Sequence, residues 1–327
     1  MNSIVKNELL KRLFEAEGEP VSGQEIADQF GLSRTAIWKY VKELEKDGYV
    51  IGTIRKKGYY LIESPDRVNE ANVQKYLTTK KYGQHIHYYE TCKSTQLIAH
   101  DEEQNGAADG TVVIAEEQTA GRGRMARPWS STAGKGIWMS VITRPSLTPQ
   151  QAPQMTLVAA VAVTRAIQEM TGIDPDIKWP NDILIKGKKV TGILTELQAD
   201  PDQVKAVILG IGMNVNQNES DFPEELQGIA TSLKMLTGKP IDRSQLIAKT
   251  LGFLEIYTEL YVKHGFGPIK MLWEGYSNTT GKRIRAVMLN ETIVGTALGI
   301  SEEGVLELKL DDGTIRGIYS ADIELSN

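Results

Sequence analysis

The spacing of apolar residues changes along the chain, and this change constrains the fold more than any other feature. Residues 1–63 carry apolar side chains at helical spacing, for example Leu9, Leu10 and Leu13. From about residue 84 the pattern becomes short β-rich runs with two long helical stretches, and residues 281–325 are β-rich throughout. At 327 residues the chain also exceeds what one compact core usually holds. We therefore expect an α+β protein of several domains, divided as 1–63, 64–276 and 277–327.

The first 63 residues predict three helices followed by a β-hairpin. Ser22 and Glu25 form the pattern of a capping box, Gly31 supplies a tight turn, and Ser33 caps the third helix. The outward face of that helix and the tip of the hairpin are basic. This is the layout of a winged helix-turn-helix domain, whose second motif helix enters the DNA major groove. The candidate DNA contacts are Ser22, Arg34, Thr35, Trp38, Lys39, Lys42, Arg55 and Lys56.

Composition limits the partners and the compartment. The chain has 37 Lys and Arg against 42 Asp and Glu, a net charge of −5, so DNA must be met through a local patch. The alternative for residues 1–63 is a small protein-interaction module whose basic residues are simply solvated.

A single cysteine, Cys92, excludes an intrachain disulfide and a multi-thiolate metal site. Because the longest apolar run, 157–163, is far shorter than the roughly 20 residues of a membrane span, and no signal peptide is evident, we expect a cytoplasmic protein without a membrane partner.

The middle of the chain predicts a mixed or antiparallel sheet with helices. Its β-rich runs are joined by hairpin-like links such as Lys186-Gly187-Lys188, which argues against a doubly wound parallel sheet. The expected strands are 85–89, 111–118, 137–143, 183–185, 190–197 and 205–211, and the expected helices are 150–170 and 244–263. Near the carboxyl end, four further runs with a turn at Asp311-Asp312-Gly313 predict a small β-barrel or sandwich.

One segment combines glycines with permanent positive charge. Gly121-Arg122-Gly123-Arg124 is followed closely by Arg127 and Trp129. Glycines let a backbone approach a ligand closely, and guanidinium groups suit carboxylates or phosphates. The spacing is not that of a Walker phosphate loop, and the chain also lacks the common zinc-protease and serine-hydrolase motifs. A surface turn with solvated arginines is the alternative for this segment taken alone.

Three more motifs follow in order. Lys178-Trp179-Pro180-Asn181-Asp182 sets a charge, an amide and a carboxylate beside a rigid Trp-Pro pair. Lys189 and Gly192 come next, at the start of an expected strand, and the run Gly210-Ile211-Gly212-Met213-Asn214-Val215-Asn216 ends the next one. Buried polar clusters need partners, which a nucleotide and a metal can supply. Taken singly, each motif is equally consistent with a turn, a solvated lysine or glycines that ease sheet packing.

Together and in this order, the motifs resemble those of the bifunctional biotin–protein ligases that double as biotin-operon repressors. The resemblance covers essentially the whole chain and includes the triplet Ser94-Thr95-Gln96 and the stretch from Gln118 to Arg124. It departs from the family pattern at Met125-Ala126-Arg127-Pro128-Trp129, where the family often has further glycine and basic residues. This departure bears on the flexibility of the loop. The resemblance implies a winged helix-turn-helix head, an α+β ligase domain and a C-terminal SH3-like β-barrel.

The resemblance also implies an activity. Such an enzyme, an ATP-dependent, AMP-forming biotin–[biotin carboxyl-carrier protein] ligase, makes biotinyl-5′-AMP from biotin and ATP. It then transfers biotin to a lysine of the carrier domains of acetyl-CoA carboxylase and pyruvate carboxylase. The adenylate would also act as co-repressor, so that a homodimer binds the biotin operator. Mg²⁺ and ATP are the implied cofactors, biotin is a substrate, and no tightly bound prosthetic group is expected.

The site residues follow from the same resemblance. The biotin site would hold Ser94, Thr95, Gln96, Gln118, Arg122, Gly123, Arg124, Lys189 and Gly192. The ATP and adenylate site would hold Arg124, Arg127, Trp129, Lys178, Asn181 and Asn214. Catalysis is expected from Lys189, Arg122, Arg124 and Asp182, where Asp182 either binds Mg²⁺ or orients the acceptor lysine. Two other functions stay open at this point, a biotin sensor without catalysis and a ligase for lipoate or another carboxylate.

Overall fold

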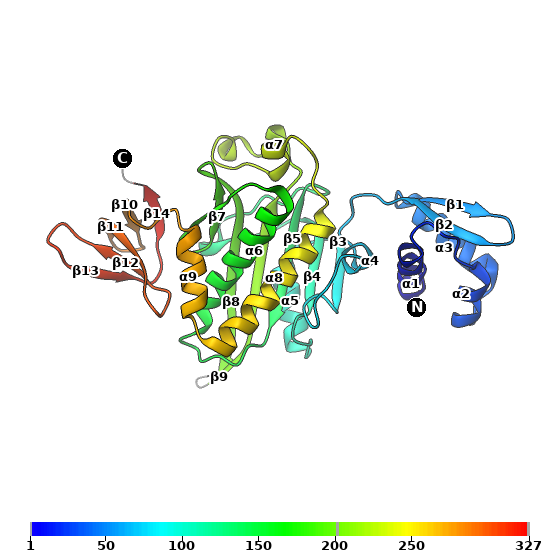
Figure 1. Cartoon of the computed structure of the whole chain (residues 1–327), viewed down its shortest axis with the longest axis horizontal. Helices are drawn as coiled ribbons and strands as arrows, with labels where there is room; N and C mark the ends of the chain where they lie inside the picture. Colours follow the sequence, from blue (N-terminus) through cyan, green and yellow to red (C-terminus); the bar gives the residue numbers. More distant parts are fainter. Residues whose placement is uncertain (1, 201–202, 326–327) are drawn as a thin grey trace.

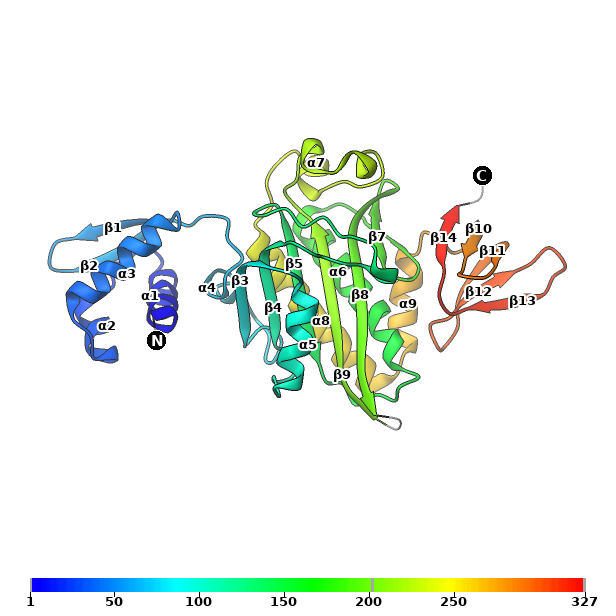
Figure 2. The same ribbon diagram turned by 180° about the vertical axis from the view of Figure 1, so that it is seen from behind.

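The computed structural model describes residues 2–200 and 203–325 and contains three units in a row (Figure 1). A small head at the amino end and a small β unit at the carboxyl end lie on opposite sides of a larger central unit, as the view from behind confirms (Figure 2). None of the helices within the described ranges combines the length and apolarity needed to cross a bilayer.

The head has the winged helix-turn-helix layout that the sequence predicts. Its elements are α1 (Asn2–Glu15), α2 (Gly23–Phe30), α3 (Arg34–Lys46), β1 (Val50–Ile54) and β2 (Gly58–Glu63), with β1 and β2 antiparallel. The Ser22 hydroxyl accepts the Glu25 N–H at 3.4 Å, and the Ser33 hydroxyl accepts the Ala36 N–H at 3.2 Å. Gly31 ends α2 at φ +63°, a conformation that favours glycine. The apolar faces of the three helices close one core, which buries Leu9, Leu13, Ile37 and Leu44.

A seven-stranded mixed sheet forms the middle of the molecule. Its order is β3-β4-β5-β9-β8-β7-β6, with β3 and β4 parallel and every other pair antiparallel. The strands are β3 (Ile86–Cys92), β4 (Val112–Gln118), β5 (Gly136–Thr143), β6 (Asp176–Lys178), β7 (Asp182–Ile185), β8 (Lys188–Asp200) and β9 (Gln203–Asn214). The predicted α+β architecture with hairpin links is therefore confirmed.

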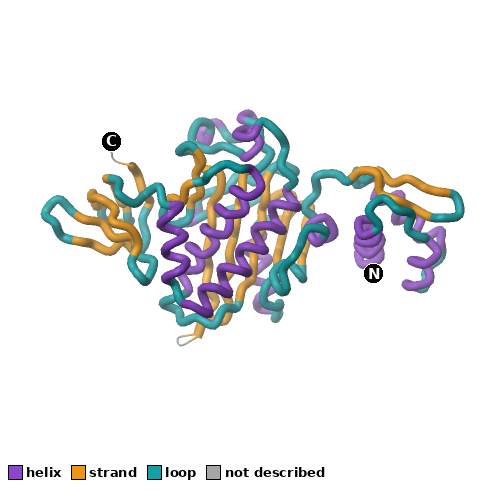
Figure 3. Tube along the Cα trace, in the orientation of Figure 1, coloured by secondary structure: helices purple, strands orange, loops and turns teal. Residues whose placement is uncertain are grey.

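Helices cover both faces of this sheet unequally. Three long helices, α6 (Met155–Thr171), α8 (Arg243–His264) and α9 (Gly267–Tyr276), lie along one face (Figure 3). On the other face, α5 (Thr95–Gln104) packs through Ala99. α5 was not predicted, because its buried positions are Thr95, Gln96 and Ala99 and it lacks an apolar stripe. Shorter elements complete the unit: α4 (Glu70–Gln74), α7 (Leu233–Thr237) and 3₁₀ turns at Arg124–Ala126, Ala152–Gln154, Glu219–Asp221 and Glu224–Leu226.

The carboxyl-terminal unit is an antiparallel sheet of five strands in the order β13-β12-β11-β10-β14. They are β10 (Arg283–Val287), β11 (Thr292–Ile300), β12 (Leu306–Lys309), β13 (Ile315–Ile318) and β14 (Asp322–Leu325). The first four match the predicted runs. The fifth was not predicted, because it has only four residues and two of them, Asp322 and Glu324, are acidic and have low strand propensity; it pairs with β10.

A buried arginine ties the head's linker to the central unit. The side chain of Arg243, on α8, is 0% exposed and bonds Asp66 through Nε at 3.0 Å and Glu116 through Nη1 at 2.9 Å. It also donates to the main-chain carbonyl of Asp66 at 2.6 Å and to that of Gly136 at 3.1 Å. Asn216, at the end of the last glycine motif, donates to the same Asp66 carboxylate at 3.1 Å. The short segment after β2 is thus fixed to the central unit at Asp66.

Candidate functional site

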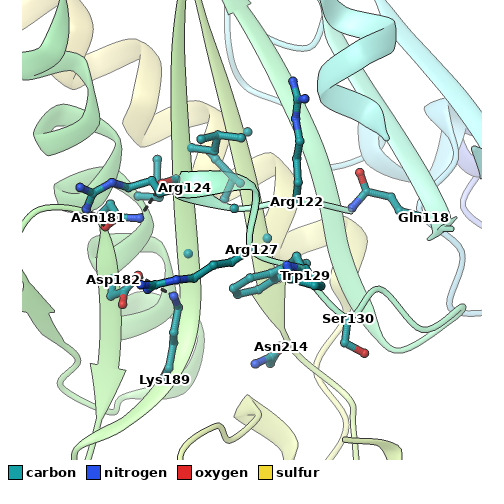
Figure 4. Close-up of a pocket in the computed structure, with 18 of the residues that line it drawn as sticks. Gln118, Arg122, Arg124, Arg127, Trp129, Ser130, Asn181, Asp182, Lys189 and Asn214 are labelled. Atoms are coloured by element: carbon teal, nitrogen blue, oxygen red, sulfur yellow. Dashed lines mark hydrogen bonds and ion pairs between the residues drawn. The ribbon is translucent and has the colours of Figure 1, made fainter. Parts of the chain in front are cut away.

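A cavity of about 330 Å³ opens above β8 and β9, beneath the segment Gly121–Trp129, which we call the glycine-rich loop (Figure 4). Most of the residues singled out in the sequence line it. They are Ser94, Thr95, Gln96, Gln118, Arg122, Gly123, Arg124, Arg127, Trp129, Asn181, Asp182, Lys189, Gly192 and Asn214. Lys178, on the edge strand β6, is not part of the lining. The cavity therefore gathers motifs as far apart in the sequence as Ser94 and Asn214.

One end of the cavity is an uncharged polar network at the start of α5. Gln118 accepts the main-chain N–H of Thr95 at 2.8 Å and lies 3.2 Å from its hydroxyl. That hydroxyl is 2.9 Å from the hydroxyl of Ser140, which in turn donates to Gln96 at 2.9 Å. Ser140 is a member of this network that the sequence motifs do not include. The available signal was a hydroxyl in the apolar strand β5, whose residues are all buried.

Two glycines make room for Trp129 on the floor of the cavity. Gly192 on β8 and Gly212 on β9 lie directly opposite each other. A Cβ at Gly212 would lie 2.6 Å from the Trp129 indole, and a Cβ at Gly192 would lie 2.8 Å from it. Trp129 also meets Trp138 edge-on, with ring centroids 6.4 Å apart. Glycine is therefore required at both positions for the indole to lie on the sheet.

The glycine-rich loop is held at its far end by the carboxyl-terminal unit. Arg124 donates to Asn181 at 3.1 Å and to the hydroxyl of Ser320 at 2.7 Å. Arg127 forms an ion pair with Asp322, the first residue of β14. Ser320 and Asp322 lie almost 200 residues beyond the loop, so the sequence carried no signal for either contact.

The residues that depart from the family pattern have a distinct backbone. Met125 and Ala126 adopt φ values of +54° and +56°, in the left-handed region that favours glycine. Such a conformation costs about 1–2 kcal/mol for a residue with a side chain. The contacts of Arg124 and Arg127 on either side offset this cost and fix the turn between them.

A cation and a carboxylate face each other at the other end of the cavity. Lys189 Nζ lies 2.7 Å from Oδ1 of Asp182 and forms an ion pair with it. The same ammonium is 5.3 Å from the centre of the Trp129 ring. Asn181 is fixed by a 2.8 Å bond to the carbonyl of Ile193. Figure 4 shows Arg127 and Lys189 both reaching towards Asp182.

Arg122 points elsewhere. Its side chain extends away from the Asp182–Lys189 pair (Figure 4) and donates to Glu196 on β8 at 3.2 Å. Glu196 also receives a bond from His100 of α5 at 2.8 Å. Neither Glu196 nor His100 was expected in the site, because neither lies in one of its motifs.

Within the part of the chain that the structure describes, no group of three or more His, Cys, Asp or Glu side chains could hold a metal ion. Asp182 is the carboxylate that lines the cavity beside Lys189 and Asn181. A magnesium ion at this place would therefore need further oxygen ligands, which the phosphates of a nucleotide provide.

The candidate DNA contacts form a separate surface on the head. Arg34, Thr35, Trp38, Lys39 and Lys42 are all exposed on α3. Arg55 and Lys56 are exposed at the tip of the β1–β2 hairpin, while Ser22 caps α2. Exposed basic residues on the second motif helix and on a wing are the arrangement with which such domains reach a groove and its phosphates.

Comparisons with known proteins agree with this geometry. A model of the biotin/lipoate A/B protein ligase family matches residues 88–214, an HTH domain matches 5–60, and the biotin protein ligase C-terminal domain matches 279–326. The bifunctional ligase/repressor BirA of Escherichia coli is 28% identical over 95% of this chain and 94% of its own.

Solved structures point the same way. The biotin protein ligase of Aquifex aeolicus in complex with biotin and ATP is 31% identical to this chain, with a TM-score of 0.64. That match covers 74% of this chain and 99% of the other.

A full-length sequence relative is more similar still. The bifunctional ligase/repressor BirA of Bacillus subtilis is 51% identical over 99% of this chain and its own entire length. With all three units matched in order, the chain belongs to the family of bifunctional biotin–protein ligases and repressors.

Proposed function

We propose that this protein joins biotin to ATP, releasing pyrophosphate, and transfers the biotinyl group from the resulting adenylate to a lysine of a carrier domain. One observation carries the proposal: a single cavity has an uncharged polar network at one end and a cluster of fixed cations at the other. Biotin has the same two ends, a neutral ureido ring and a carboxylate. The family relationship supports both substrates.

The neutral end suits the ureido ring. A buried ring with donors and acceptors needs partners of both kinds, and uncharged ones fit best. Thr95, Gln118 and Ser140 form such a set, in which each side chain is already oriented by its neighbours. We propose that Ser94 and Gln96 complete this set, and that Gly123 and Gly192 let the ligand approach the backbone closely.

The charged end suits the first step of the reaction. A carboxylate oxygen of biotin attacks the α-phosphorus of ATP, and the bond to pyrophosphate breaks. Because two anions must meet, cations held in place lower the barrier. Lys189 and Arg124 are proposed for this role, since Asp182 and Asn181 already orient them. Mg²⁺, held by Asp182 and the phosphates, would neutralise part of the phosphate charge.

The second step is attack by the carrier lysine on the acyl carbonyl, with AMP as the leaving group. A lysine with the usual pKa of about 10.4 must lose a proton first, and Asp182 is a candidate acceptor if it does not hold Mg²⁺. Trp129 and Arg127 are proposed to lie near adenine, and Asn214 near the ribose or phosphate. Lys178 would have to act from outside the cavity.

We propose that the functional units divide at residues 63 and 276, where β2 and α9 end. Residues 1–63 would bind the biotin operator through α3 and the hairpin tip, as part of a homodimer whose co-repressor is the adenylate. The carrier substrates would be the biotin domains of acetyl-CoA carboxylase and pyruvate carboxylase, in the cytoplasm.

An ATP–pyrophosphate exchange assay tests the proposal. Labelled pyrophosphate is incubated with ATP and the protein in the presence of biotin, lipoate or octanoate. We expect exchange with biotin and little with the other two acids. Exchange that depends on lipoate or octanoate would change the assigned substrate. The absence of exchange with all three, in a folded protein, would refute the ligase proposal.

A further inference from the structure

Glu196 lies where three separate parts of the central unit meet. It projects from β8 and contacts Arg122 of the glycine-rich loop at 3.2 Å through Oε1. Its other oxygen is 2.8 Å from Nε2 of His100, on α5. The side chains of Glu196 and His100 are 29% and 19% exposed, so the pair is partly shielded from water. None of the motifs in the sequence includes either residue.

His100 has a partner at each ring nitrogen. Its Nδ1 lies 2.9 Å from Nε2 of Gln198, and its Nε2 lies 2.8 Å from Oε2 of Glu196. An amide N–H donates and a carboxylate accepts, so these contacts suit the imidazole tautomer that carries its proton on Nε2. Glu196 and Gln198 are two residues apart on β8 and face the same side of the sheet. They hold the imidazole between them.

This arrangement keeps Glu196 ionised. Burial raises the pKa of the Glu196 carboxyl, but hydrogen bonds from His100 and Gln96, together with the charge of Arg122, outweigh it and hold the pKa below its usual value. The carboxylate is therefore a fixed negative charge under the loop. His100 and Gln96 are one helical turn apart, so both reach Glu196 from the same face of α5.

Arg122 connects Glu196 to the glycine-rich loop. Its main chain forms an isolated antiparallel bridge with Pro128, which joins the two arms of the loop. The other end of the loop is held by Arg124 and Arg127. The Arg122 side chain points away from the Asp182–Lys189 pair, so its charge is directed at Glu196 and not at that end of the cavity.

We propose that Glu196 is a positioning residue that anchors Arg122 and thereby keeps the glycine-rich loop closed over the bound adenylate. The proposal rests on the adenylate-forming function proposed above. His100, fixed by Gln198, orients the carboxylate.

The test uses Glu196→Gln in the full-length protein, which keeps the shape of the side chain and removes its charge. The adenylate is formed in place from biotin and ATP, and its dissociation is followed after a chase with unlabelled biotin. We expect dissociation about threefold to tenfold faster, the range for a partly exposed ion pair with a hydrogen bond. The KM for biotin in pyrophosphate exchange should rise by a similar factor, while kcat falls by less.

A double-mutant cycle separates anchoring from a general loss of structure. Arg122→Gln alone should accelerate dissociation about as much as Glu196→Gln, and the double variant should be no faster than either. Glu169→Gln is the matched control, because Glu169 forms an exposed ion pair with Lys249 far from the loop. It should release the adenylate at the wild-type rate. Additive effects in the cycle would overturn the anchor.

His100→Phe gives an independent arm if Glu196→Gln folds poorly. It removes the donor to Glu196 and keeps an aromatic ring, so dissociation should accelerate by a smaller factor than in Glu196→Gln. If the wild-type protein holds the adenylate, and both Glu196→Gln and His100→Phe release it at the wild-type rate, the anchor is refuted and the ligase function stands. A wild-type protein that makes no adenylate would refute both.

Discussion

Replacing Arg243 with methionine is expected to destabilise the central unit strongly. The guanidinium is fully buried and bonds the carboxylates of Asp66 and Glu116 and two main-chain carbonyls. Glu116 is 6% exposed, so the substitution would leave a buried carboxylate without its opposite charge. Breaking a buried ion pair in this way costs about 3–5 kcal/mol. Asp66 is 42% exposed on its side chain and adds less, because water can solvate it.

For a unit of this size, that cost corresponds to a melting temperature lower by about 6–20 °C. Thermal unfolding followed by circular dichroism measures it. The double variant Arg243→Met with Glu116→Gln should recover part of the loss, because no uncompensated charge remains. The matched control is Arg165→Met, at an exposed position on α6, which should change stability by no more than about 0.5 kcal/mol.

Limited proteolysis gives a second measurement on the same variant. Asp66 lies in the segment that joins the head to the sheet, and Arg243 holds both its side chain and its carbonyl. We expect cleavage between the head and the central unit to become faster in Arg243→Met. If Arg243→Met unfolds and is cleaved like the wild-type protein, the buried anchor is refuted. It is also refuted if Arg243→Met with Glu116→Gln is less stable than Arg243→Met alone.

Four other changes have expected outcomes. Lys189→Ala should lower pyrophosphate exchange by orders of magnitude with an unchanged circular dichroism spectrum, and near-normal exchange would remove Lys189 from the mechanism. Deleting residues 1–63 should abolish footprinting on the operator, yet biotin transfer should survive in part; a retained footprint would refute the DNA contacts assigned to the head. Arg124→Gly should speed adenylate release about tenfold to a hundredfold and label lysines of an unrelated protein with biotin, whereas unchanged release and labelling would exclude Arg124 from the closed loop. Burial raises the pKa of Glu255, but three N–H donors from residues 80–82 outweigh it and hold that pKa below its ordinary value of 4.5. The Glu255 carboxylate therefore stabilises the fold above pH 4.5, and this stabilisation is lost as the pH falls through the lowered pKa. Urea titrations should show Glu255→Gln about 1–3 kcal/mol less stable than the wild type at pH 7, and no less stable in strong acid.

The local features of this protein were available from its sequence. Ser22 and Ser33 cap the helices that follow them, and Gly31 makes the turn between them. The hairpin at Lys186-Gly187 forms where the sequence predicts it, with both residues at positive φ. Each of these depends on neighbours within about four residues, so composition and spacing are sufficient to predict it.

Two elements, α5 and β14, were missed for physical reasons. The buried positions of α5 are Thr95, Gln96 and Ala99, which serve the cavity and a small contact with the sheet, so no apolar stripe marks the helix. β14 is short and bears acidic residues because it is an outer strand. Function and edge position, rather than burial of a large apolar face, shaped both sequences.

Only the tertiary structure decided which charges meet. Arg122 and Glu196 are 74 residues apart, Arg127 and Asp322 are 195 apart, and Asp66, the partner of Arg243, is 177 away. The sequence presents these groups as charges of the right kind but carries no local rule that pairs them. Their pairing follows from strand order and domain packing, which bring distant segments together only after loops of that length have closed.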